Sequence, residues 1–226
     1  MTKPSARRAP VSEPQFDASL REALDRDGYV VLHDILDKQS IAAIRLRVDE
    51  LLASHRGDPS RKHGGTVHVD DLVEDPICRP VTANARIADV FAHLLGSSYH
   101  VPRLHFRAPQ PGYGAQTLHT DAVGPTSDGY ADAATAIVSL TAFTLKNGAT
   151  CVVPGSHRVP RERASGGADA NRAVVVTAPA GSAIVFHGHL LHGGTRNEST
   201  ARRDALQLSA VRSGVAYFSG ATPTKS

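Results

Sequence analysis

The spacing of the apolar residues changes once along the chain, near residue 97, and this change limits the folds that the chain can adopt. Before it, residues 17–28 and 37–55 carry apolar side chains at helical intervals, and residues 29–36 between them are patterned as a strand. Residues 84–95, followed by Gly96, carry a third helical pattern. The first part of the chain is therefore predicted to be mainly helical.

The ends of these helices are marked by residues that favour caps. Asp17 and Asp37 stand where the first two helices would begin, and Gly28 stands where the first would end. Residues 56–75 are rich in glycine, histidine and charge, which indicates a loop with a short strand near Val67–Val69.

After residue 97 the helical patterns give way to short β-rich runs separated by glycine, proline, asparagine and aspartate. Many short strands of this kind are typical of a β-sandwich or barrel. The predicted runs are 99–108, 115–121, 134–145, 149–154, 172–179, 182–188 and 205–219.

Length and charge indicate a soluble protein of one domain. From 226 residues we expect a domain over 16–218 with tails at 1–15 and 219–226. The N-terminal tail lacks the apolar core of a secretory signal, and no apolar run is long enough to span a membrane. The net charge of +3 is small, so neither nucleic acid nor a membrane is an expected partner. Cys78 and Cys151 lack ligand spacing, which fits a cytoplasmic protein.

The stretch QTLHTD, residues 116–121, holds a candidate metal site. In a strand, side chains two residues apart share a face, so His119 and Asp121 would converge on one point. An imidazole and a carboxylate suit a divalent first-row metal, but a third ligand is needed to hold it. The alternative is that the histidine merely hydrogen-bonds the aspartate in a packed strand.

A later stretch offers the third ligand. His187, His189 and His192 follow a β-rich run, and we favour His192 because a turn-rich loop after it leads to Arg203 at the start of the next strand. A guanidinium that faced the interior of a barrel there would need an anion. A ligand pair formed by His187 and His189 on one strand face stays open.

Three motifs in order carry a family resemblance: QTLHTD (116–121), NGATCVVPGSH (147–157) and HGGTRNESTARR (192–203). Together they resemble the phytanoyl-CoA dioxygenase family of iron(II)- and 2-oxoglutarate-dependent oxygenases, over roughly residues 20–212. The resemblance implies a mainly β fold with flanking helices, a double-stranded β-helix or cupin-like jelly roll.

The resemblance also implies roles for individual residues. It gives His119, Asp121 and His192 as the iron ligands, and Arg203 as the partner of the distal carboxylate of 2-oxoglutarate. Gln116 and Thr150 stand where related enzymes contact this cosubstrate. Two further candidates come from the residues themselves, as substrate contacts: Arg107, which shares a strand face with Arg103, and His68 in the early loop. Solvent-exposed positions are the alternative for both.

The expected activity is hydroxylation of an unactivated C–H bond in a small, polar metabolite or natural-product intermediate, using iron(II), 2-oxoglutarate and O2 and releasing succinate and CO2. Halogenases of related type have glycine or alanine in place of Asp121, so the carboxylate argues against halogenation. Desaturation, epimerisation and cyclisation stay open, and the protein is expected to be a monomer or small homo-oligomer. The alternatives are a cupin-type metal-dependent hydrolase or isomerase that does not use 2-oxoglutarate, and a non-catalytic jelly-roll binding module.

Overall fold

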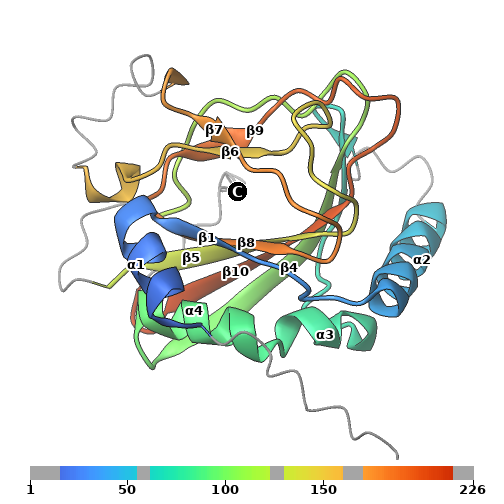
Figure 1. Ribbon diagram of the computed structural model, residues 1–226. Helices are drawn as coiled ribbons and strands as arrows, with labels where there is room; N and C mark the ends of the chain where they lie inside the picture. Colours follow the sequence, from blue (N-terminus) through green and yellow to red (C-terminus); the bar gives the residue numbers. More distant parts are fainter. Residues whose placement is uncertain (1–15, 55–61, 123–129, 160–169, 216–226) are drawn as a thin grey trace, which may run out of the picture.

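The computed structural model describes residues 16–54, 62–122, 130–159 and 170–215 (Figure 1). The tails predicted at 1–15 and 219–226 lie outside these ranges. The elements in chain order are α1 (Ala18–Asp27), β1 (Tyr29–Leu32), α2 (Lys38–Ser54), β2 (Lys62–His63), β3 (Thr66–Val69), the 3₁₀ turn η2 (Pro76–Cys78), α3 (Arg79–Thr82), α4 (Ala85–Leu95), β4 (Tyr99–Pro109), β5 (Ala133–Ser139), β6 (Thr150–Val152), η3 (Ser156–Arg158), β7 (Val174–Val175), β8 (Ala183–His187), β9 (His192–Gly194) and β10 (Ala205–Arg212).

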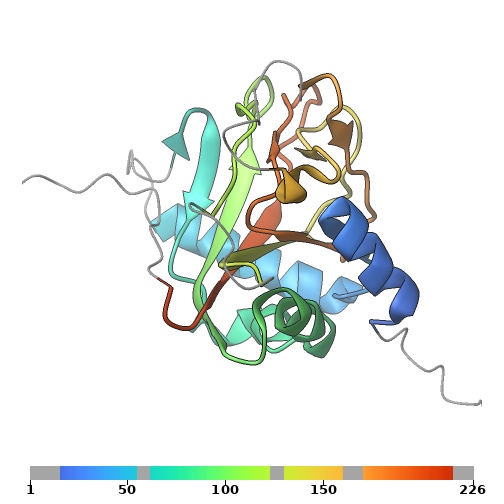
Figure 2. The same cartoon turned by 90° about the vertical axis from the view of Figure 1, so that its left-hand side faces the viewer.

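The strands form two antiparallel sheets. The larger has seven strands in the order β1-β8-β5-β10-β4-β3-β2, and the smaller has the order β7-β6-β9. Strands that are neighbours in space are mostly distant in sequence, as in the pairs of β10 with β4 and with β5. Figure 1 shows the smaller sheet above the larger one, with α4 and α3 below it, and Figure 2 shows the same layers from the side.

Two apolar cores follow from the alternation of side chains along the strands. On β4, Leu104, Phe106 and Ala108 point to the helices and join the main core with residues such as Phe91 and Ile44. The opposite face of the larger sheet looks toward the smaller sheet across a second core, whose members include Phe143, Val152, Ile184 and Phe186. The polar residues 103, 105 and 107 of β4 alternate with the first set and so lie on this inner side.

The three long helices occur where the sequence predicts them. The Asp17 carboxylate accepts a hydrogen bond of 3.0 Å from the backbone N–H of Leu20, and Gly28 ends α1 with φ 82°. The Asp37 carboxylate likewise accepts 2.7 Å from the N–H of Ser40 at the start of α2. These caps satisfy backbone donors that the first turn of a helix leaves unpaired.

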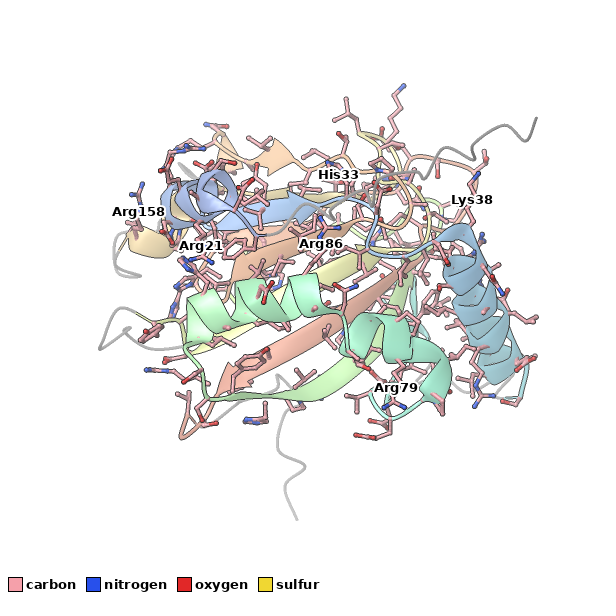
Figure 3. The ribbon with its side chains drawn as sticks, turned by 60° about the horizontal axis from the view of Figure 1, so that its bottom comes forward. Arg21, His33, Lys38, Arg79, Arg86 and Arg158 are labelled. Atoms are coloured by element: carbon pink, nitrogen blue, oxygen red, sulfur yellow. The ribbon has the colours of Figure 1, made fainter. Side chains whose placement is uncertain are left out.

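Helix α4 is tied to the end of β1 as well as packed on the larger sheet. Its N-cap is Asn84, whose side chain accepts from the backbone N–H groups of Arg86 and Ile87. The Arg86 Nη1 donates 2.6 Å to the carbonyl oxygen of His33, and Figure 3 places the two residues close together. Val90 and Phe91 on the buried face are at most 1% exposed.

Several predicted strands are shorter in the structure. The run 172–179 contains only β7, the strand predicted over 29–36 ends at Leu32, and that over 134–145 ends at Ser139. Beyond Leu32 the chain turns at Asp34, which has φ 55°. Apolar sequence continues past these points, but the chain bends away from its partner strand, so periodicity alone overestimates the length.

The predicted strand over 115–121 is wrong in its extent. The segment is attached at two points: the N–H of Gln116 donates 2.9 Å to the Gly194 carbonyl, and His119 forms an isolated bridge with His192. His119 and Asp121 therefore do not converge through regular strand alternation. In the described ranges, no helix is long and apolar enough to cross a membrane.

Candidate active site

Three side chains from two distant segments line one cavity between the sheets. His119 and Asp121 precede β5, and His192 is the first residue of β9. The backbones of His119 and His192 exchange two N–H to carbonyl hydrogen bonds of 2.9 Å each. One ligand atom from each of the three side chains lies within 4.8 Å of the others, and the described ranges contain no other such group. The fold thus brings together the three residues predicted as metal ligands.

Both imidazoles are held by their Nδ1 atoms. Nδ1 of His119 lies 2.9 Å from the Thr117 carbonyl oxygen, and Nδ1 of His192 lies 2.9 Å from that of Leu190. A carbonyl oxygen only accepts, so each Nδ1 donates a hydrogen bond to it, and Nε2 is the ring atom that can bind a metal. Burial lowers the pKa of His192, and the neighbouring His119 adds to this against the opposing charge of Asp121. The His192 ring is therefore neutral, as a metal ligand must be.

The Asp121 carboxylate is oriented by a threonine on β5. Thr135 Oγ1 donates a hydrogen bond of 2.6 Å to Asp121 Oδ2. The other oxygen, Oδ1, lies 3.6 Å from His192 Nε2. One carboxylate oxygen is thus fixed by the protein, and the other faces the lone pair of a neutral imidazole.

Arg203 lines the same cavity and is almost fully buried, with 8% exposure. Its Nε donates 3.1 Å to the Gly148 carbonyl, and its Cζ lies 4.5 Å from the centre of the Phe143 ring. The neighbouring Asp204 is paired instead with Arg45 and Arg202. Burial lowers the pKa of Arg203 to about 10, with the charge of Arg107 as the next cause, so the guanidinium is still charged at neutral pH.

The two other predicted cosubstrate contacts also line this cavity. Thr150, 3% exposed, pairs with Gly194 in the register of β6 and β9. The side-chain oxygen of Gln116 accepts 2.9 Å from the Gly194 N–H, which leaves the amide NH2 of Gln116 as a donor. Gly194 has no room for a side chain, since a Cβ there would lie 2.5 Å from the Gly114 carbonyl oxygen.

The structure separates the two predicted substrate contacts. Arg107, half-buried on β4, lines the cavity, whereas His68 on β3 is its register neighbour but does not line it. The alternative ligands lie in another cluster, in which the ring centre of His187 is 5.4 Å from that of His189 and 5.1 Å from that of His157. They do not belong to the group of close ligand atoms around Asp121.

Four supporting residues were not predicted from the sequence. They are Thr135, which orients Asp121; Phe186, whose ring centre lies 4.5 Å from that of His192; Phe143, which covers Arg203; and Asn197, which joins the loops before Arg203. Thr135 interrupts an otherwise apolar run, and Asn197 stands in a turn-rich loop. Such signals mark a position as unusual, but they do not identify its partner.

A buried histidine beside Arg107 predicts a loss of stability in acid. His105 is 6% exposed, and burial, followed by the charges of Arg107 and Arg103, lowers its pKa to about 3. An unfolded chain takes up this proton near pH 6.5. The free energy of unfolding should therefore fall as the pH drops from about 6.5 toward 3, by up to a few kcal/mol from this residue.

The measurement is urea unfolding of wild type and His105→Gln across this pH range. The variant should lose less stability between pH 6.5 and 4 than wild type, while His187, whose pKa burial also lowers to about 3, keeps part of the slope in both. At pH 8 and above, the difference between the free energies of unfolding of the two proteins should no longer depend on pH. Parallel curves over the whole range would contradict the assignment.

A model of the phytanoyl-CoA dioxygenase (PhyH) family matches residues 24–205, most of the chain. The chain belongs to this family. Every site residue predicted from the sequence lies in the matched range, and all of them except His68 line the cavity. The resemblance stated from the three motifs is thereby confirmed.

Two curated proteins illustrate how similar this PhyH-family chain is to others. It is 31% identical over 168 residues to an ectoine dioxygenase of Sphingopyxis alaskensis, covering 66% of this chain and 51% of the relative. It is 29% identical over 206 residues to the dioxygenase cdmA of Talaromyces verruculosus, covering 83% of this chain and 70% of the relative. The aligned part thus spans about half of the first relative's length.

Solved structures share the fold. EctD from S. alaskensis, crystallised with 2-oxoglutarate and 5-hydroxyectoine, has a TM-score of 0.69 and 25% identity, covering 92% of this chain and 79% of EctD. The non-heme α-ketoglutarate-dependent carbocyclase SnoK from nogalamycin biosynthesis has a TM-score of 0.76 at 19% identity, covering 93% and 89%. The predicted jelly roll with flanking helices is confirmed.

Proposed function

We propose that this protein is an iron(II)- and 2-oxoglutarate-dependent dioxygenase that hydroxylates an unactivated C–H bond of a small, polar metabolite. The observation that carries the proposal is one cavity that holds His119, Asp121 and His192 within ligand distance of one another and the buried guanidinium of Arg203. A hydrolase or isomerase of cupin type would need the first three residues, but it would not need a buried cation that has no carboxylate partner among the described residues.

The donor set suits iron(II). Two imidazoles, whose Nδ1 atoms face backbone carbonyls so that Nε2 can bind a metal, and one carboxylate oxygen form the two-histidine, one-carboxylate set of non-heme iron oxygenases. Iron(II), when bound together with 2-oxoglutarate and O2, supplies the oxidation that cleaves the C–H bond and converts 2-oxoglutarate to succinate and CO2. Family membership supports the same cofactors.

The protein's own residues bind and orient the reactants. Arg203 offers a planar fork of donors that matches a carboxylate in two parallel hydrogen bonds, and we assign it to the distal carboxylate of 2-oxoglutarate. The hydroxyl of Thr150 and the amide NH2 of Gln116 line the same space and are assigned as further cosubstrate donors. Thr135 keeps the Asp121 carboxylate in position, and Phe186 packs on the His192 ring. Arg107 is assigned to the substrate.

Location and assembly belong to the same proposal. We place the protein in the cytoplasm as a monomer or small homo-oligomer. Free Cys78 and Cys151 suit a reducing compartment.

The proposed activity is tested by two linked measurements. Iron(II) and 2-oxoglutarate are added anaerobically, and we expect the weak visible charge-transfer band of a chelated keto acid. Candidate metabolites are then screened in air for stimulated succinate release, with mass analysis of the product. A gain of one oxygen supports hydroxylation, whereas loss of two hydrogens replaces it with desaturation or cyclisation. A folded protein that forms no band contradicts the assignment and favours a hydrolase, an isomerase or a binding module.

A further inference from the structure

We propose that the substrate carries a carboxylate and that the Arg107 guanidinium binds it. This inference rests on the proposed function and names the chemical class of its substrate. The observations that carry it are the position of Arg107 on the cavity wall, its lack of an anionic partner, and the balance of charge in the cavity.

Arg107 belongs to the wall of the candidate active site. It lies near the end of β4, between His68 of β3 and Ala205 of β10 in the register of the larger sheet. Ala205 is small, so the space in front of the long Arg107 side chain is not filled from that neighbour. Arg107 lines the same cavity as the metal ligands Asp121 and His192 and as Arg203. The Arg107 side chain thus shares one cavity with the metal ligands and with the arginine assigned to the cosubstrate.

No carboxylate in the described ranges forms an ion pair with Arg107, whereas two other partly buried arginines are paired. Arg212 binds Asp132 at 2.9 Å, and Arg202 binds Asp204 at 2.8 Å. Burial lowers the pKa of Arg107, against the attraction of Asp121 and Asp70. A half-buried guanidinium held without a direct partner is costly, and such a group is retained where a ligand supplies the anion.

The charges of the loaded cavity leave Arg107 uncompensated. The charged residues that line it are Arg107, Asp121 and Arg203. Iron(II) is balanced by Asp121 and by the carboxylate of 2-oxoglutarate next to the keto group, and Arg203 is balanced by the distal carboxylate. Neutral His105, beside Arg107 on the same strand face, adds no charge. One positive charge then remains at Arg107, and a substrate monoanion neutralises it.

A carboxylate fits this guanidinium better than a neutral polar group does. A guanidinium binds a carboxylate through two parallel charge-assisted hydrogen bonds, about twice as strong as neutral ones. The geometry also fixes the orientation of the substrate, because a bidentate pair has one plane. Arg107 would thus select acids and position a C–H bond of the acid relative to the metal ligands.

The test uses pairs of probes that match in shape but differ in charge: propionate with propionamide, and benzoate with benzamide. Each is titrated calorimetrically into the anaerobic wild-type complex with iron(II) and saturating 2-oxoglutarate, while the charge-transfer band is recorded. We expect at least one acid to bind at least tenfold more tightly than its amide, with the band retained. The preference should vanish in Arg107→Gln. It should persist in Arg79→Gln, which removes an equal charge from the exposed surface of α3 (Figure 3).

Each other outcome overturns the inference. Equal binding of acid and amide, no binding of either acid, or an unchanged preference in Arg107→Gln would contradict a carboxylate at Arg107. Loss of the band on adding the acid would mean that the probe displaces 2-oxoglutarate. A much higher 2-oxoglutarate requirement in Arg107→Gln would assign the guanidinium to the cosubstrate instead. Failure of wild type to form the band at all is a different result, because it contradicts the proposed function.

Discussion

Replacing Asp121 with alanine should abolish turnover and the charge-transfer band while the protein stays folded. The carboxylate is the only anionic member of the three-residue group, so its loss leaves two neutral imidazoles to hold a divalent ion. Loss of a residue that only orients a metal ligand typically costs 10- to 100-fold in metal affinity or activity. Loss of the ligand itself should therefore cost about 10³-fold or more. Iron(II) affinity, measured anaerobically, and succinate release report the effect.

A matched control separates coordination from orientation. Thr135→Val removes the 2.6 Å hydrogen bond to Asp121 Oδ2 but keeps the carboxylate and nearly the same volume. It should weaken iron binding by about 10- to 100-fold, less than Asp121→Ala does. Circular dichroism and urea unfolding should show both variants folded. An Asp121→Ala protein that binds iron(II) and turns over normally would remove Asp121 from the metal centre.

Replacing Arg203 with alanine should raise the 2-oxoglutarate concentration that the enzyme requires by about 100-fold, since truncating one partner of a buried, hydrogen-bonded charge pair costs about 3 kcal/mol. The substitution also removes a buried cation that has no carboxylate partner in the described ranges, so the free energy of unfolding should change little in comparison. The band is titrated with 2-oxoglutarate in the variant and in wild type.

Arg203→Lys is the informative partner variant. It keeps the positive charge but loses the planar fork of donors, so its 2-oxoglutarate requirement should fall between those of wild type and Arg203→Ala. If Arg203→Lys requires no more 2-oxoglutarate than wild type, a positive charge alone is enough and the bidentate pairing is contradicted. If Arg203→Ala titrates like wild type, the cosubstrate carboxylate lies elsewhere.

Local sequence accounts for the helices and most of the strands because the forces that place them act over a few residues. Asp17, Asp37 and Asn84 cap helices through hydrogen bonds to backbone groups two or three residues away. Gly28 ends α1 because it accepts a positive φ at little cost. Strand ends were less predictable, since they depend on where a partner strand departs, as after Leu32 and Ser139.

The sequence by itself determined which residue types were available for a metal site: a histidine and a carboxylate in QTLHTD, three later histidines and an arginine after them. Only the tertiary structure decided among them, because His119 and His192 meet through backbone hydrogen bonds across 73 residues, and that pairing places His187 and His189 in a different cluster. It alone also decided that Arg202 pairs with Asp204 whereas Arg203 and Arg107 face the cavity. Burial and partner choice are set by contacts between distant segments, which no local pattern records.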